Sequence, residues 1–132
     1  MNTEASPIKV MLVDDEDGFT TLTKMNLERS GKFVVAVEND PVNAAERARH
    51  LLPHIIVLDL VMPGMDGGDV AAQIRATPEL SNVKIIILTA LVSQEEDEAS
   101  TIPIGGKNFR SLSKPVKIER LEAAICEELG IA

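Results

Sequence analysis

Several residues that could do phosphate or metal chemistry stand where predicted β-strands end. Asp59 directly follows the apolar run Ile55–Leu58, which is bounded by turn residues. A short run of this kind is typical of a strand buried on both faces of a parallel sheet. A carboxylate after such a strand lies at the edge where open α/β sheets carry their chemistry. Taken alone, Asp59 would be better explained as the cap of a turn, and only the rest of the chain favours a chemical role.

Other polar side chains follow other predicted strands in the same way. Asp14 and Asp15 come after the apolar segment 8–13, Thr89 follows 83–88, and Lys114 follows the weaker segment 108–113. In a parallel sheet the carboxyl ends of the strands share one edge. We therefore expect three carboxylates, one hydroxyl and one ammonium group to converge there.

Three carboxylates cannot converge without a counter-charge. At ~5 Å and an effective dielectric constant of ~20, each pair of carboxylates costs roughly 3 kcal/mol. Mg²⁺ relieves this repulsion, since it prefers oxygen ligands and often uses one or two carboxylates together with phosphate oxygens. A remaining carboxylate can attack phosphorus and form an aspartyl phosphate. Phosphoryl transfer also needs positive charge and hydrogen bonds on the phosphoryl oxygens, which Lys114 and Thr89 could supply.

The elements that must position these side chains alternate along the chain. Strands are predicted at 8–13, 33–37, 55–58, 83–88 and 108–113, and helices at about 18–30, 39–52, 67–76 and 118–129. Asp66 is the expected N-cap of the third helix. Residues 93–106 are ambiguous: Ser93 could start a short acidic helix that Pro103 and the Gly105-Gly106 pair would break. Helical crossovers force parallel pairing, which predicts a three-layer α/β/α sandwich.

Composition limits the classes of protein and partner. The chain has 132 residues with 45% hydrophobic content, which fits one domain spanning 1–132 with a core of about 8–129. Its net charge of −8 argues against nucleic acid as a direct partner. The absence of an apolar run near 20 residues argues against a membrane span. A single cysteine, Cys126, and a polar start without signal-peptide features predict a cytoplasmic protein.

The order and spacing of these segments resemble the receiver domain of two-component response regulators. The matching pieces are Val13-Asp14-Asp15, the stretch 58–67 around Asp59, Leu88-Thr89-Ala90 and Lys114-Pro115. Each piece alone is weak evidence for the family, but the pieces in this order and at nearly this spacing are strong evidence. The resemblance covers the chain from about 8 to 129. The resemblance implies a flavodoxin-like fold with a five-stranded parallel sheet in the order 2-1-3-4-5. It also implies a cis peptide bond between Lys114 and Pro115.

The family's site roles transfer by resemblance to matching positions. Asp59 would be the phosphoacceptor, and Thr89 and Lys114 would contact the phosphoryl group. Mg²⁺ would be held by side chains and one backbone carbonyl: Asp14, Asp15, Asp59 and the carbonyl of Val61. Val61 and Leu91 would flank the phosphoryl group. Since both are apolar and cannot orient a water, we expect slow to moderate self-dephosphorylation.

The sequence departs from the family near its end. Receivers usually carry Tyr or Phe three residues before the lysine, where Ser111 stands here. Either an insertion lets Phe109 take the aromatic role, or the aromatic switch is altered and output uses another face. We favour the altered switch. If 108–113 is regular, Phe109 and Ser111 share one face with Ser113, and Arg110 and Leu112 share the other.

These residues predict a phosphoacceptor receiver of a two-component phosphorelay. It would accept a phosphoryl group from a sensor histidine kinase or phosphotransfer protein and then change its binding to an unknown output partner. It would not be an enzyme beyond self-phosphorylation and self-dephosphorylation at Asp59. No output segment follows the last helix, so the receiver would stand alone or belong to a larger protein. Receivers often dimerise through their fourth helix, fifth strand and fifth helix, so the resemblance also implies a homodimer through that surface, which contains the unusual stretch 91–113 here.

Two other functions remain open. One is a receiver-like interaction module that no longer takes phosphate: the unusual stretch 91–113 keeps it open, although the intact set of site residues, Asp14, Asp15, Asp59, Thr89 and Lys114, argues against it. An aspartate-nucleophile phosphatase is the weaker alternative, because such enzymes need a second acid where Val61 stands and a cap segment for the substrate. Turnover of a phosphate ester would distinguish the phosphatase from the other two functions. Covalent labelling of Asp59 would distinguish the phosphoacceptor receiver from the interaction module that no longer takes phosphate.

Overall fold

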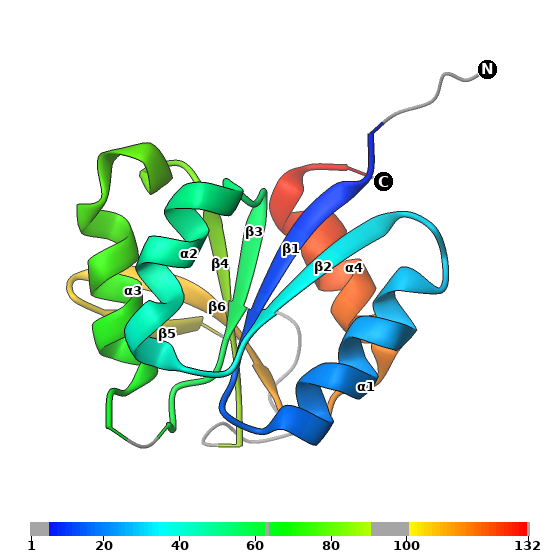
Figure 1. The fold of residues 1–132 in the computed structure, drawn as a ribbon, viewed down its shortest axis with the longest axis horizontal. Coiled ribbons are helices and arrows are strands. Elements are labelled where there is room, and N and C mark those ends of the chain that lie inside the picture. The colour runs from blue at the N-terminus through cyan, green and yellow to red at the C-terminus, as the bar shows by residue number, and fades with distance from the viewer. Residues whose placement is uncertain (1–5, 63, 91–100, 132) are drawn as a thin grey trace.

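The computed structural model describes residues 6–62, 64–90 and 101–131, which build a sheet covered by helices on both faces. The strands are β1 (Ile8–Val13), β2 (Phe33–Glu38), β3 (Ile55–Leu58), β4 (Lys84–Thr89), β5 (Thr101–Ile104) and β6 (Lys107–Ser113). The helices are α1 (Asp17–Glu28), α2 (Ala44–Leu51), α3 (Gly67–Ala76) and α4 (Ile118–Leu129), with 3₁₀ turns η1 (Pro41–Asn43) and η2 (Pro78–Leu80). As Figure 1 shows, α2 and α3 cover one face and α1 and α4 the other. The expected three-layer sandwich is confirmed.

The sheet order is β2-β1-β3-β4-β6-β5, and the first five strands in this order are parallel. Leu58 at the end of β3 pairs with Val13 on β1 and with Ile87 on β4. This shared register aligns the carboxyl ends of the central strands at one edge, the lower edge in Figure 1.

The expected five-stranded, fully parallel sheet needs one correction. A sixth strand, β5, pairs antiparallel with β6 and forms the edge of the sheet. Gly105 (φ 58°) and Gly106 (φ 83°) connect the two strands through a two-residue turn with left-handed backbone at both positions. Pro103 is tolerated because an edge strand can lack a ladder donor. The expected acidic helix after Ser93 lies outside the described residues, as does part of the surface considered for dimerisation.

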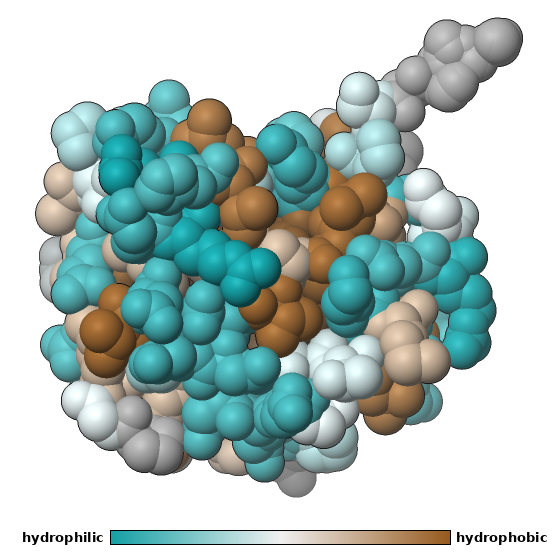
Figure 2. Space-filling view, in the orientation of Figure 1, coloured by the Kyte–Doolittle hydropathy of each residue, from teal (hydrophilic) through white to brown (hydrophobic). Residues whose placement is uncertain are grey.

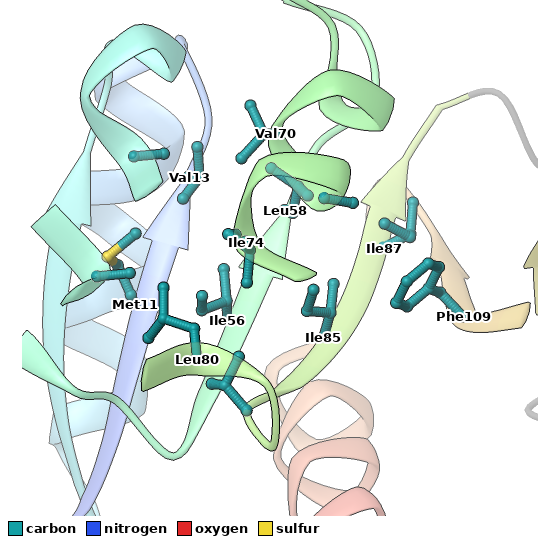
Figure 3. Packing of buried hydrophobic residues seen from close by; sticks show 14 of the residues in the cluster. Met11, Val13, Ile56, Leu58, Val70, Ile74, Leu80, Ile85, Ile87 and Phe109 are labelled. Atoms are coloured by element: carbon teal, nitrogen blue, oxygen red, sulfur yellow. The ribbon is translucent and has the colours of Figure 1, made fainter. Parts of the chain in front are cut away.

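Two apolar clusters fill the space on either side of the sheet. β3 is buried along its whole length, so its side chains enter both clusters. In Figure 3, Ile74 of α3 lies beside Ile56 of β3 and Val70 lies nearer Leu58, with Phe109 of β6 at the edge of the same cluster. The opposite cluster packs β1, β3 and β4 against α1 and α4. The sheet is therefore a rigid platform for residues at its edge.

The outer surface is mainly hydrophilic. On the face seen in Figure 2, polar side chains cover the exposed sides of the helices, and apolar surface remains between α2 and α1. The edge strand β2 lies in this gap, and its Val34 is 48% exposed. Among the described residues, no helix combines the length and apolar character needed to cross a membrane.

Candidate functional site

The residues predicted at the strand ends do meet at one edge of the sheet. Asp14 follows β1, Asp59 follows β3, Thr89 is the last residue of β4, and Lys114 follows β6. The sheet's hydrogen bonding continues to this edge, because the Asp59 N–H donates to the Val13 carbonyl at 3.0 Å and the Lys114 N–H donates to the Thr89 carbonyl at 3.1 Å. The backbone thus fixes where these side chains start.

Three carboxylates form a compact cluster at this edge. Asp14, Asp15 and Asp59 each offer one oxygen, and these oxygens lie within 4.8 Å of one another. Asp14 and Asp59 are only 3% and 6% exposed, whereas Asp15 is exposed. The cluster therefore has two buried ligands and one that faces solvent.

Lys114 is the counter-charge that the structure shows in this cluster. Its Nζ lies 2.6 Å from Asp14 Oδ2, 3.0 Å from Glu16 Oε1 and 3.5 Å from Asp59 Oδ2. The ammonium also lies 4.4 Å from the centroid of the Phe19 ring, a cation–π contact. The predicted cis peptide bond between Lys114 and Pro115 is confirmed.

Asp14 and Lys114, the closest ion pair, differ in whether burial or their contacts dominate the pKa shift. Burial raises the pKa of Asp14, and the hydrogen bonds from Lys114 and the Glu16 N–H only partly offset it. Burial alone would lower the pKa of Lys114, but its contacts with Asp14 and Glu16 raise it well above the usual range. The lysine is stabilised as a cation by several acids at once. At Asp14 the contacts with Lys114 and Glu16 do not fully offset the cost of burying the carboxylate. A further cation would therefore stabilise its negative charge.

Asp14 is held in place by the loops around it. Its Oδ1 accepts the Glu16 N–H at 3.0 Å, and its backbone carbonyl accepts Asn39 Nδ2 at 2.7 Å. Asn39 also donates to Thr20 Oγ1 at 3.0 Å, which links the loop after β2 to α1. These contacts connect the loop after β1 to the loop after β2 and to α1.

The start of α3 lies directly against the loop that carries Asp59. The Gly67 N–H donates to the Leu60 carbonyl at 2.9 Å, and a Cβ at Gly67 would lie 2.7 Å from the Cα of Leu60. Asp66 caps the helix by accepting the Asp69 N–H, as predicted. Only glycine permits this approach between helix and loop.

Val61 lies beside Asp59 and is open to solvent. Its side chain is 57% exposed, and its N–H donates to Asp59 Oδ1 at 3.3 Å. Leu91, the other residue expected to flank a phosphoryl group, lies outside the described residues. The expectation of slow to moderate self-dephosphorylation therefore stays a prediction.

The alternation predicted for β6 is confirmed. Phe109 packs in the α2–α3 cluster and Leu112 in the opposite one. The register places Ser111 beside Ile87, whereas Phe109 lies four residues before Ser113, the partner of Thr89. That spacing is about 13 Å along a strand, too far for the Phe109 ring to occupy a place beside Thr89. The register therefore argues against Phe109 taking the aromatic role, and the altered switch stays a prediction.

Ser111 itself is unusual, since it is 1% exposed and its Oγ has no hydrogen-bond partner within the described part of the chain. A buried hydroxyl in this state carries a desolvation penalty. It occupies the position where a receiver normally carries an aromatic ring.

The donor set fits a hard divalent cation. All candidate side-chain ligands are carboxylate oxygens, and two of them are buried side by side with a single lysine between them. Mg²⁺ accepts such oxygen donors and keeps water in its remaining positions, which the exposed Asp15 would permit.

Two neighbours of Lys114 were not anticipated from the sequence. Glu16 pairs with its ammonium group and the Phe19 ring lies beside it. The signal for Glu16 was its place directly after the Asp14-Asp15 pair. Phe19 has no signal of its own, because its contact depends on α1 starting at Asp17.

Comparisons with known proteins agree with this geometry. The family model described as "Response regulator receiver domain" matches residues 10–126. The chain is 32% identical over 117 residues to the alkaline phosphatase synthesis transcriptional regulatory protein PhoP of Bacillus subtilis, covering 89% of this chain and 46% of that protein. It is 31% identical to the response regulator Rre1 of Synechocystis, covering 92% and 51%. The chain spans about half the length of these curated relatives.

Solved structures share the fold. The receiver domain of the Francisella response regulator 1452 aligns with a TM-score of 0.75 at 26% identity, covering 95% of this chain and 98% of that one. The Vibrio cholerae chemotaxis protein CheY4 aligns with a TM-score of 0.78 at 24% identity, covering 93% and 99%.

Proposed function

Since this chain belongs to the response regulator receiver domain family, we propose that it accepts a phosphoryl group on Asp59 and changes its binding to an output partner. The donor is the phosphohistidine of a sensor kinase or phosphotransfer protein. Acceptance and loss of this group are the only reactions that we assign to the chain. Its net charge of −8 makes nucleic acid an unsuitable direct partner for the receiver itself.

The observation that carries this proposal is the different engagement of the two buried carboxylates. Both oxygens of Asp14 accept short hydrogen bonds, from the Glu16 N–H at 3.0 Å and from Lys114 at 2.6 Å. Asp59 has longer contacts, 3.3 Å to the Val61 N–H and 3.5 Å to Lys114. Asp59 therefore keeps more electron density available to attack phosphorus.

The transfer balances as a simple displacement. An Asp59 carboxylate oxygen forms a bond to phosphorus while the bond from phosphorus to the donor's imidazole nitrogen breaks, and its electron pair stays on that nitrogen. Lys114 neutralises the phosphoryl oxygens, and the Thr89 hydroxyl can donate a hydrogen bond to one of them. Mg²⁺, held by Asp14, Asp15, Asp59 and the Val61 carbonyl, supplies further positive charge when bound.

Intact mass after incubation with acetyl phosphate and Mg²⁺ tests the proposal. The wild type and Asp17→Asn, which removes an exposed carboxylate outside the cluster, should each gain one phosphoryl group. Asp59→Asn should gain none. A folded wild type that gains no mass would contradict the proposal and favour an interaction module that no longer takes phosphate.

A second measurement separates the receiver from a phosphatase. With p-nitrophenyl phosphate as substrate we expect no sustained turnover, because Val61 stands where a phosphatase of this type needs an acid. Turnover that disappears in Asp59→Asn would contradict the receiver and favour the phosphatase.

A further inference from the structure

A second polar site lies at the opposite edge of the sheet. A pocket of about 600 Å³ opens at the amino ends of β4 and β6. Lys84, at the start of β4, and Thr89, at its end, are five residues apart, which is about 16 Å along the strand. The pocket is therefore separate from the carboxylate cluster. Its volume is within the range of small-molecule sites.

The pocket gathers positive charge in an acidic molecule. Four of the chain's 13 Lys and Arg residues line it, against one of the 21 Asp and Glu residues. The four cations are Arg75, Lys84, Lys107 and Arg110, and the acid is Glu128. Like charges gathered without matching acids repel one another, so an anion bound among them would be stabilised.

Most of these cations have no carboxylate partner. Arg110 is paired with Glu127 at 2.7 Å, but its Nε–H is buried without a hydrogen-bond partner among residues 6–62, 64–90 and 101–131. Within the same residues Arg75, Lys84 and Lys107 form no ion pair, and both lysines are exposed. Three positive charges thus remain uncompensated.

The pocket is built on rigid elements. Arg75 lies in the last turn of α3, its guanidinium 5.5 Å from the centroid of the Phe109 ring and its Nη1 donating to the Leu80 carbonyl at 3.4 Å. Phe109 is 6% exposed and packed in the core beneath it. The aromatic residue that is too far from Thr89 to act as a switch supports one of the pocket's cations instead.

We propose that this pocket binds a small compound carrying a phosphate or pyrophosphate group. Guanidinium and ammonium groups make their strongest hydrogen bonds to such oxygens, and three uncompensated cations match a compact group with several negative charges. The amides of Asn82 and Asn108 also line the pocket and can donate. A long polyanion would be repelled by the surrounding surface, since the chain carries a net charge of −8.

Isothermal titration calorimetry with inorganic pyrophosphate in metal-free buffer tests this site. The wild type should bind one equivalent, and Lys84→Gln/Lys107→Gln should weaken binding by about tenfold or more, because two charge-assisted hydrogen bonds are lost. The double variant Lys32→Gln/Lys117→Gln, which removes the same charge from exposed positions elsewhere, should bind like the wild type.

Two further arms locate the ligand and define its chemistry. Asp59→Asn should bind pyrophosphate as the wild type does, which separates this site from the phosphoacceptor and keeps its outcome independent of phosphorylation. Citrate, a carboxylate of similar charge, should bind more weakly. The proposal is overturned by no binding, by equal losses in both double variants, or by citrate binding as tightly as pyrophosphate.

Discussion

At the scale of single residues, the three carboxylates differ in burial and in partners. Asp14 is buried with both oxygens engaged, Asp59 is buried with longer contacts, and Asp15 is exposed. Lys114 is the cation that joins the two buried carboxylates, and its side chain is 13% exposed. Removing this charge should therefore affect stability as well as phosphorylation.

We predict that Lys114→Met lowers the free energy of unfolding by about 3 kcal/mol in metal-free buffer, because it leaves the buried carboxylates of Asp14 and Asp59 without the cation that pairs with them. Mg²⁺ should restore part of this loss. Urea unfolding with and without Mg²⁺ measures both effects. Lys117→Met, which removes an exposed charge three residues away, is the control. Equal stability of the two variants would mean that Lys114 does not compensate the cluster.

The sequence was sufficient to predict which residues meet at the site but not every contact between them. Parallel strands bring Asp14, Asp59 and Lys114 to one edge whatever the details of the loops. The contacts of Glu16 and Phe19 with Lys114 depend instead on the first turn of α1. The local pattern of residues does not determine where that turn lies relative to the sheet.

At the scale of elements, the closest approach at the site is between α3 and the loop after β3. Gly67 opens α3 where a Cβ would overlap the backbone around Leu60. Gly68, the next residue, has its nearest neighbouring atom, the side-chain Asp66 Oδ1, at 3.2 Å from an added Cβ. The two glycines are adjacent but differ in the space around them.

We predict that Gly67→Ala lowers stability by about 3 kcal/mol, since the backbone must shift to relieve the overlap, and also slows labelling of Asp59. Gly68→Ala should change stability by less than about 1 kcal/mol, because helix propensity favours alanine and the capping Asp66 side chain, 3.2 Å from the added Cβ, needs only a small shift. Chemical denaturation compares the pair. Similar losses in both variants would contradict the close approach as the cause.

Another element contact makes stability depend on pH. Glu28 at the end of α1 accepts the Val35 N–H of β2 and Lys24 Nζ, both at 2.9 Å. These hydrogen bonds, the one from Val35 foremost, lower the pKa of Glu28. A lowered pKa contributes stability that is present above the unfolded-state value of 4.5 and is lost as pH falls through the folded-state value.

We therefore predict that Glu28→Gln is less stable than the wild type by about 1 kcal/mol at pH 7, a value reduced for solvent screening. The difference should shrink as the pH falls below 4.5 and Glu28 becomes protonated. Thermal unfolding across this range measures it, with Glu119→Gln on the exposed side of α4 as control. A constant difference at all pH values would show that charge is not the cause.

The β5–β6 hairpin shows where prediction at the element scale failed. The parallel strands were predicted because their apolar runs are distinct, but β5 is only four residues long and contains Pro103. Gly105 and Gly106 were taken as helix breakers, although a Gly-Gly pair between two short runs is also a hairpin signal. Whether the glycines end a helix or form a hairpin turn depended on whether β5 could pair with the free edge of β6. That pairing is a tertiary contact, which the local sequence does not determine.

At the scale of the whole molecule, the two edges of the sheet carry opposite charge. The carboxyl edge gathers acidic side chains that a cation would stabilise, and the amino edge of β4 and β6 gathers basic ones. Ligands that bind the folded state alone raise its stability in proportion to the logarithm of their concentration. Mg²⁺ should therefore raise the free energy of unfolding of the whole domain.

We predict that Mg²⁺ at about 100 times its dissociation constant stabilises the protein by about 2.7 kcal/mol. NaCl at the same ionic strength should have a much smaller effect. Asp15→Asn should raise the stability of the metal-free protein, because it removes one charge from the cluster, and should reduce the gain from Mg²⁺. A melting temperature indifferent to Mg²⁺ would contradict the carboxylate cluster as a metal site.

The most direct test of the central claim identifies the carboxylate that carries the phosphoryl group. After reaction with acetyl phosphate and Mg²⁺, borohydride reduction converts an aspartyl phosphate to homoserine, which peptide mass spectrometry can locate. We predict homoserine at position 59 alone, and none when acetyl phosphate is omitted. Homoserine at position 14 or 15, or at no position in a folded sample, would contradict Asp59 as the phosphoacceptor.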